Sequence, residues 1–247
     1  MHLSIHRWED DARSRRAAAA LGLDDVQVWI ATAPPAEADL SALACLLSPD
    51  ERARADRFAV SEPRRQFVFG RALLRQLVGA CATVDPVTLA FDRAPRGKPF
   101  LSQPVVNGDL RFNLSHSGRI VAIALARGRD VGVDIEAIAC QGDWRLLAER
   151  IFSPRELREL HALPTRQQPQ AFFDGWTRKE AYLKATGEGL TEALTAIEVT
   201  LAPGREPELL RVPAGTEGGS RWTLRVVPLP PGYAGTVAFE KSYRRGV

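Results

Sequence analysis

Val131-Gly132-Val133-Asp134-Ile135-Glu136 is a stretch with the alternating pattern of a β-strand. Side chains alternate across a strand, so Asp134 and Glu136 point to one face, and Gly132 leaves room there for a close approach. Two carboxylates side by side repel each other unless a cation lies between them. The stretch predicts a strand beside a hard-metal site, whereas the alternative is an exposed strand with two solvated acids.

The segment 176–184, Trp-Thr-Arg-Lys-Glu-Ala-Tyr-Leu-Lys, has the spacing of a helix. Residues four apart share a helix face, so Glu180 and Lys184 present an acid and a base together, one turn after Trp176. Taken alone, this pair is a surface ion pair worth about 0.3–0.5 kcal/mol. Together with Asp134 and Glu136 it forms a carboxylate trio beside a lysine, which suits Mg²⁺ that holds a phosphate ester.

The chain repeats itself at a nearly fixed distance, which indicates an internal duplication. Three pairs of segments match in order: 26–30 with 131–135, 48–51 with 153–156, and 67–75 with 176–184. The second pair reads Ser-Pro-x-Glu in both copies, a capping box with proline at the first helical position, so each begins a helix. We therefore predict an α+β fold built twice, with halves at residues 1–129 and 130–247.

The remaining elements follow from periodicity, helix caps and Gly/Pro turns. The expected helices are Ala36–Leu47, Pro49–Phe58, Pro63–Ala82, Trp144–Arg150, Pro154–Leu160 and Gln167–Thr186. Beyond the two valine-rich runs of the duplication, strands are expected at Val87–Phe91, Ile120–Leu125, Ile197–Leu201, Trp222–Val227 and Thr236–Phe239.

The two halves differ at the positions that carry the acids. Where the second half has Asp134, Glu136 and Glu180, the first has Trp29, Ala31 and Arg71. Only the second half can therefore bind the metal, and a single ligand site at the seam between the halves is expected.

Two short polar segments are further candidates for phosphate binding. Residues 112–118, Phe-Asn-Leu-Ser-His-Ser-Gly, predict a turn in which Ser115 and His116 donate to an oxyanion, although a lone histidine is more often structural. Gly97-Lys98-Pro99 on its own indicates only a tight turn. The arginines between 52 and 75 are mostly expected on a solvated helix face, with one or two left to clamp a phosphate.

Composition narrows the class of protein. The chain has 247 residues, 45% apolar content, a net charge of +3 and a pI near 9.0. This excess of positive charge is too small for a dedicated nucleic-acid binder but favours an acidic or phosphorylated partner. The N-terminus is charged, which does not suggest a targeting peptide. The longest apolar run, Ile120–Ala126, is too short to span a membrane, so we expect a soluble cytoplasmic protein. Cys45, Cys81 and Cys140 show no metal spacing and are expected to be buried.

Four of these segments in this order closely resemble the Sfp-type 4′-phosphopantetheinyl transferases. They are Gly97-Lys98-Pro99, residues 112–117, residues 132–136 and residues 176–184. The resemblance spans roughly Leu47 to Leu190, and the set together is far more specific than any one motif.

The resemblance implies a monomer of two similar α+β halves related by a pseudo-twofold axis, with coenzyme A in the cleft between them. The enzyme would transfer the phosphopantetheine arm of coenzyme A to a serine of an apo acyl or peptidyl carrier protein, an acidic helical domain. Adenosine 3′,5′-bisphosphate would be released. Mg²⁺ is the implied metal, with Mn²⁺ as the alternative.

The resemblance also assigns roles to single residues. Asp134, Glu136 and Glu180 would be the metal ligands, and Lys184 and His116 would bind the diphosphate. Ser115 and Lys98 would reach the adenosine 3′-phosphate end. Arg54 and Arg65 are further phosphate contacts, although the family arginine near Arg65 aligns equally well with Gln66.

For the chemistry, Glu180 is the expected general base, directly or through a metal-bound water. Two other functions stay open from the sequence: a non-catalytic coenzyme A or nucleotide-binding regulator, and another Mg²⁺-dependent phosphotransferase or nucleotidyl transferase acting on a small molecule. For carrier docking, the helix after Pro154 and the loop after Gly142 are the expected surfaces.

Overall fold

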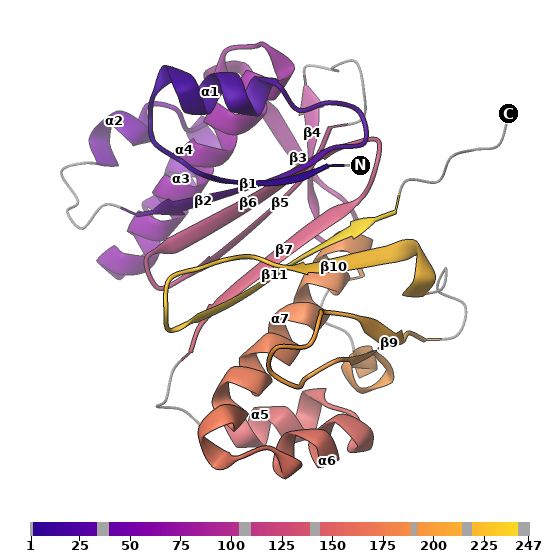
Figure 1. Cartoon of the computed structure of the whole chain (residues 1–247). Helices are drawn as coiled ribbons and strands as arrows, with labels where there is room; N and C mark the ends of the chain where they lie inside the picture. The colour runs from indigo at the N-terminus through magenta and orange to yellow at the C-terminus, as the bar shows by residue number, and fades with distance from the viewer. Residues whose placement is uncertain are drawn as a thin grey trace, which may run out of the picture. The chain divides into compact units, whose positions relative to one another are not determined.

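The computed structural model of the chain describes residues 2–33, 40–103, 110–138, 144–188, 192–213 and 219–241. The chain forms two compact units, Met1–Pro95 with Pro99–Gly128 and Arg96–Lys98 with Arg129–Val247. Each unit combines a β-sheet with helices, so the predicted α+β fold is confirmed (Figure 1). Among the described residues, no helix has both the length and the apolar character needed to cross a bilayer.

The first unit is built on a four-stranded sheet in the order β1-β2-β6-β5. Its strands are β1 (Leu3–Arg7), β2 (Val26–Thr32), β5 (Leu110–Ser117) and β6 (Ile120–Arg127). Only β1 and β2 pair in parallel. The helices are α1 (Ala12–Ala19), α2 (Ser41–Ala44), α3 (Pro49–Ala55) and α4 (Ser61–Ala82), and a hairpin joins β3 (Ala90–Arg93) to β4 (Pro99–Gln103). The main core of this unit lies between α4 and the sheet, where Leu73, Leu77, Val121 and Ile123 pack together.

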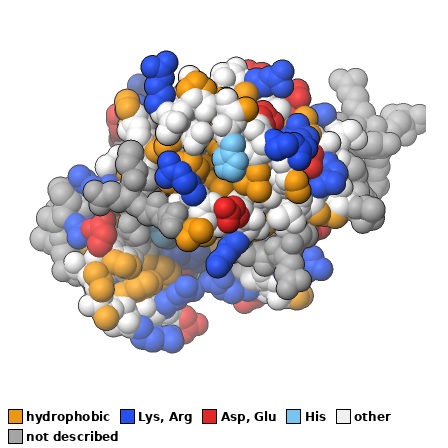
Figure 2. All heavy atoms as spheres, turned by 90° about the horizontal axis from the view of Figure 1, so that it is seen from below, with side chains coloured by type: hydrophobic (Ala, Val, Ile, Leu, Met, Phe, Trp, Pro, Cys, Tyr) orange, Lys and Arg blue, Asp and Glu red, His pale blue; other side chains and the backbone are white. Residues whose placement is uncertain are grey.

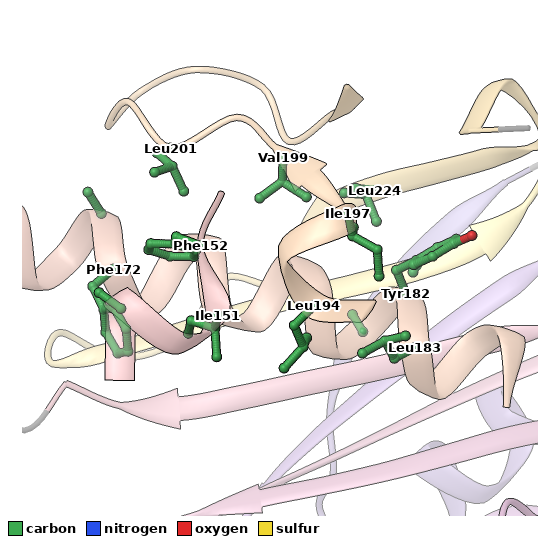
Figure 3. Packing of buried hydrophobic residues seen from close by; sticks show 14 of the residues in the cluster. Ile151, Phe152, Phe172, Tyr182, Leu183, Leu194, Ile197, Val199, Leu201 and Leu224 are labelled. Carbon is green, nitrogen blue, oxygen red and sulfur yellow. The ribbon is translucent and has the colours of Figure 1, made fainter. Parts of the chain in front are cut away.

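The second unit has a three-stranded sheet in the order β10-β11-β7. The strands are β7 (Val131–Ala137), β10 (Trp222–Val226) and β11 (Tyr233–Glu240), with a separate short pair, β8 (Glu198–Val199) and β9 (Leu209–Arg211). The helices are α5 (Trp144–Ile151), α6 (Pro154–Ala162) and α7 (Gln168–Thr186). Figure 3 shows the core that α7 shares with its neighbours, including Phe152, Phe172, Tyr182 and Leu201.

The sheets of the two units share three strands in the same arrangement, to which the first unit adds β1. In each, an early strand pairs antiparallel with the last strand, which pairs antiparallel with the strand before it. The first unit has β2-β6-β5 and the second has β7-β11-β10. This common order confirms the internal duplication predicted from the repeated segments.

The two Ser-Pro-x-Glu segments form the same device in both units. Glu51 completes the capping box of α3 and binds the guanidinium nitrogens Nε of Arg71 and Arg75, both at 2.6 Å. Glu156 completes the capping box of α6 and binds Lys179 Nζ at 2.7 Å. One glutamate thus caps a short helix and anchors the long helix that follows. Arg71 and Arg75 are largely buried in this pairing, so the expectation of a solvated face is wrong for them.

Several expected elements differ from the structure. Of the helix expected at Ala36–Leu47, residues 36–39 lie outside the described chain and only Ser41–Ala44 is α-helical in the rest. The strand expected at Val87–Phe91 begins at Ala90, because Asp85 caps a 3₁₀ turn at Pro86–Thr88. The first strand and helix, β1 and α1, were not expected, since charged residues hide their periodicity.

The cysteines follow the expectation only in part. Cys81 is buried, whereas Cys45 is exposed, and both are free thiols. Cys140 lies outside the described residues. Cys45 is the C-cap residue of the short helix α2.

Candidate active site

The site begins with an unusually close contact between α7 and β7. A Cβ atom added at Gly132 would lie 2.2 Å from the carbonyl oxygen of Ala181 and 2.4 Å from the nitrogen of Ala185. Only glycine therefore allows the helix backbone to lie directly on the strand, as expected from the sequence. The face of β7 that carries Asp134 and Glu136 is thereby brought against the turns of α7 that carry Glu180 and Lys184.

A second contact ties α7 to β11, the strand that pairs with β7. Thr236 of β11 is the cross-strand partner of Asp134. Its hydroxyl lies 3.1 Å from that of Thr177 on α7, and both threonines are buried. This buried hydroxyl pair ties the helix to the sheet on the face that carries the acids.

The three predicted carboxylates lie in one electrostatic cluster. Glu180 is only 8% exposed and Asp134 is 3% exposed. Burial and the negative charge of Asp134 raise the pKa of Glu180 to about 7, Lys184 lowers it in part, and Glu136 raises it further. The structure thus brings together the acids of β7 and α7 that the sequence singled out, and their role as metal ligands stays a prediction.

Lys184 supplies the positive charge of the cluster. Its Nζ donates a 2.6 Å hydrogen bond to Oδ1 of Asp134, within an ion pair in which the carboxylate is buried and the lysine is partly exposed. The expected acid–base face of α7 is present, but the ammonium binds the carboxylate of β7 as well as facing Glu180.

The residues fit a hard divalent cation chemically. All three acids offer carboxylate oxygens, and Oε1 of Glu180 is buried and accepts no hydrogen bond from the described part of the chain. As the side chains stand, no three His, Cys, Asp or Glu groups among the described residues are arranged to hold a metal ion. Lys184 neutralises Asp134 instead.

Lys179, next to Glu180, has a role that the sequence did not reveal. Its ammonium is fully buried and donates to Glu156 at 2.7 Å and to the carbonyls of Ile151 and Leu194 at 2.7 and 3.0 Å. Three acceptors match the three donors of an ammonium, which explains a lysine in an arginine-rich chain. Burial lowers the pKa of Lys179, and Glu156 offsets part of that effect. The signal that could have revealed this pair was its separation in sequence, because Lys179 follows Glu156 at nearly the same distance as Arg75 follows Glu51.

Lys98 belongs to the second unit and lies at the C-terminal end of α7. Its Nζ is 2.6 Å from the carbonyl oxygen of Ala185 and 3.0 Å from Oδ1 of Asp130. The preceding Gly97 has a φ of 88°, so the expected tight turn is confirmed. The expected contact of Lys98 with a phosphate stays a prediction.

The other candidate residues lie in the first unit. Ser115 and His116 are in strand β5 rather than in the expected turn, and they therefore point to opposite faces, Ser115 buried and His116 exposed. The turn comes two residues later, at Gly118, whose carbonyl accepts a hydrogen bond from the side chain of Gln66. The strand was not expected from the sequence, because the polar residues in 113–117 obscure its alternation.

The two arginine candidates are on neighbouring helices of the first unit. Arg54 is exposed on α3 with its guanidinium 5.2 Å from the ring centre of Phe67. Arg65 on α4 pairs with Glu62 at 2.9 Å. Arg54 also lines a polar cavity of about 390 Å³ together with Glu51, Arg71 and Arg93.

The fold and the site define an α+β protein with a buried carboxylate–lysine cluster. Comparison with known protein families narrows this class further. A family model described as the 4′-phosphopantetheinyl transferase superfamily matches residues 130–238, and one described as the N-terminal region of a 4′-phosphopantetheinyl transferase matches residues 31–127.

Individual relatives agree with the family models. The chain is 42% identical to the 4′-phosphopantetheinyl transferase HetI of Nostoc sp., over 77% of this chain and 80% of the relative. It is 32% identical to a 4′-phosphopantetheinyl transferase of Bacillus subtilis, over 63% and 66%. It is 30% identical to a phosphopantetheinyl transferase of Thraustochytrium sp., over 87% and 78%.

The chain therefore belongs to the 4′-phosphopantetheinyl transferase superfamily. The resemblance found in the sequence is confirmed, and so is the prediction of an enzyme of this class.

Proposed function

We propose that the chain transfers the 4′-phosphopantetheine arm of coenzyme A to a serine of an apo acyl or peptidyl carrier protein and releases adenosine 3′,5′-bisphosphate. Mg²⁺ would be the metal, with Mn²⁺ as an alternative. The cluster of Asp134, Glu136, Glu180 and Lys184 is the observation that carries this proposal. Family membership supplies the reaction class, and the cluster supplies groups that fit a metal-bound diphosphate.

The proposed metal ligands are Asp134, Glu136 and Glu180. Oxygen ligands from carboxylates suit Mg²⁺, which when bound supplies positive charge to the diphosphate oxygens. The structure supports this assignment because the buried Oε1 of Glu180 has no partner among the described residues and the three acids repel one another. A cation would remove that repulsion.

Lys184 is the proposed partner of the diphosphate in the second unit. Its ammonium, partly exposed, is held beside the acids by Asp134. A fixed cation stabilises the charge that builds on the bridging oxygen as the phosphorus–oxygen bond breaks. His116, Ser115, Arg54 and Arg65 are the proposed phosphate contacts from the first unit.

Glu180 is the proposed general base for the carrier serine. A base works best when its pKa lies near the working pH; burial raises the pKa of Glu180 to about 7 in the metal-free chain, and a bound cation would lower it. A carboxylate that binds the metal is a weaker base, so the proton can instead pass through water. In both cases Glu180 accepts the proton from the serine hydroxyl or from that water.

The carrier is proposed to dock on helix α5 of the second unit. On α5, Leu146 and Leu147 are 56% and 51% exposed and lie between the exposed arginines Arg145 and Arg150. Figure 2 shows that, seen from below, Lys and Arg side chains lie scattered among apolar and acidic ones. An acidic helical domain with an apolar patch complements such a surface. The helix after Pro154, α6, stays a predicted docking surface beside α5, and the loop after Gly142, the other expected surface, lies outside the described residues.

The docking surface is tested by replacing both leucines of α5 with glutamate. We expect the KM for the carrier to rise at least about tenfold, because two charges enter an apolar contact and repel an acidic partner. The KM for coenzyme A should stay unchanged. Leu23→Glu, at a site 75% exposed in the first unit, is the matched control. An unchanged KM for the carrier in the double variant would place the docking surface elsewhere.

The reaction itself is tested by mass spectrometry of apo carrier proteins incubated with the chain, coenzyme A and Mg²⁺. A carrier that gains the mass of phosphopantetheine supports the proposal. Glu180→Gln should nearly abolish the gain while coenzyme A still binds, and unimpaired turnover of that variant would refute the role of Glu180. A chain that binds coenzyme A but modifies no carrier from a panel would instead be a coenzyme A-binding regulator.

A further inference from the structure

Three residues of the β3–β4 hairpin cluster with the second unit. Arg96–Lys98 belong to that unit, whereas Pro95 and Pro99 on either side belong to the first. The side chain of Lys98 is only 15% exposed, and its ammonium donates to the carbonyl of Ala185 at 2.6 Å and to Asp130 at 3.0 Å. This lysine is therefore engaged by the protein itself.

The first acceptor lies at the end of α7. Ala185 is in the last turn of the helix, where carbonyls run out of intrahelical donors and the helix dipole favours a cation. Gly187 ends the helix with a φ of 72°, and a Cβ added there would lie 3.4 Å from Cδ of Lys98. The aliphatic part of Lys98 thus packs over the same helix end that its ammonium caps.

The second acceptor lies at the start of β7. Asp130 directly precedes Val131, the first residue of that strand. One ammonium therefore bridges the two elements that form the site, because α7 carries Glu180 and Lys184 and β7 carries Asp134. Lys184 is the residue next to Ala185, so its ion pair with Asp134 depends on this last turn staying wound.

We propose that Lys98 is a positioning residue that clamps the end of α7 to the start of β7 and thereby holds Lys184 against Asp134. The inference deepens the proposed function and rests on it, since Lys98 would act on catalysis through α7 and not by contact with the adenosine 3′-phosphate. The family resemblance predicts the opposite role, a direct phosphate contact.

Two variants separate these roles. Lys98→Met removes the ammonium but keeps an apolar stem over Gly187. Asp130→Asn removes only the second anchor, and it also removes a carboxylate that competes with phosphate for Lys98. A clamp is weakened by both substitutions, whereas a phosphate contact is lost in the first and kept or strengthened in the second.

The first measurement is transfer to a carrier protein with coenzyme A and with 3′-dephospho-coenzyme A. For a clamp, we expect Lys98→Met to lower kcat by the same factor with both substrates, and Asp130→Asn to lower it in the same direction. A rise in the KM for coenzyme A alone, with dephospho-coenzyme A unaffected and Asp130→Asn unimpaired, would overturn the proposal.

The second measurement needs no transfer activity, so it also stands if the proposed function fails. Amide hydrogen exchange of the free protein is followed at residues 183–187, where the Gly187 amide donates to the carbonyl of Leu183 at 2.9 Å. Loss of a charge-assisted hydrogen bond should speed exchange there about tenfold in Lys98→Met. Arg205→Met, at an exposed arginine of the same unit, is the control. Unchanged exchange at 183–187 in both clamp variants contradicts the clamp.

Discussion

Glu180 is the residue on which the proposed chemistry depends most. It is buried beside Asp134 and Glu136, and these surroundings disfavour its charged form. A cation placed among the three carboxylates would reverse that preference. Without the cation, the same residue is only partly ionised at neutral pH, and its ionisation works against the stability of the folded chain.

The raised pKa of Glu180 predicts a stability that falls as pH rises. The folded protein keeps the proton up to about pH 7, whereas the unfolded chain releases it near the ordinary glutamate pKa of 4.5. Between these values the native state binds more protons, so its stability decreases with increasing pH. With divalent cations chelated, Glu180→Gln should be more stable than the original protein by roughly 1–3 kcal/mol at pH 8 and by far less at pH 5.

Urea unfolding at the two pH values measures this difference, and added Mg²⁺ should stabilise only the original protein at pH 8. A difference between the two proteins that does not change with pH would show that the environment of Glu180 is more polar than described.

Lys179 and Lys184 are close in sequence and on the same helix but should respond differently to substitution. Lys179→Met leaves Glu156 buried without its cation, which should cost about 3–5 kcal/mol of unfolding free energy. Lys184→Met also removes the cation of a buried carboxylate, that of Asp134, but the lysine is itself 30% exposed, so the loss of stability should be smaller than in Lys179→Met while transfer is abolished. Urea unfolding and a carrier-loading assay on both variants check this contrast. Equal losses of stability would contradict the assigned roles.

At the scale of elements, the site depends on the contact between α7 and β7. Alternation in residues 131–136 and the four-residue spacing of Glu180 and Lys184 were sufficient to predict a strand face with two acids and a helix face with an acid and a base. That the two faces meet could be expected only from the family resemblance, because no local signal specifies which helix packs on which strand. Gly132 indicated that another part of the chain could approach the strand closely at this position.

Gly132→Ala should disrupt that contact. The added Cβ would meet backbone atoms of α7, which cannot move without shifting the helix from the strand, so we expect a loss of about 3 kcal/mol and of nearly all transfer activity. Gly70→Ala on α4 is the matched control, since its Cβ would lie 3.4 Å from the nearest side-chain atom and alanine favours a helix. A stable and active Gly132→Ala protein would mean that α7 lies further from β7 than described.

At the scale of the whole molecule, the chain contains two versions of one strand order, of which only the second carries the acids. The repeat was predictable because the Ser-Pro-x-Glu caps and the strands that precede them recur at one offset. Strand β5 was not, because its polar residues Asn113, Ser115 and Ser117 hide its alternation. The anchoring of α7 by Lys179 and Lys98 was also hidden, since each lysine binds backbone carbonyls that no motif marks and a carboxylate distant in sequence, Glu156 or Asp130.

Because only one copy of the duplicated fold carries the three acids, we expect each chain to bind one cation. This is the central expectation. Electron paramagnetic resonance measures this stoichiometry directly when Mn²⁺ is titrated into the protein with coenzyme A. The signal of free Mn²⁺ disappears when the ion binds, so the remaining signal gives the amount bound. The account predicts one bound Mn²⁺ per chain, lost in Asp134→Asn and in Glu180→Gln and retained in Glu188→Gln. Undiminished binding in the Asp134 and Glu180 variants would contradict it.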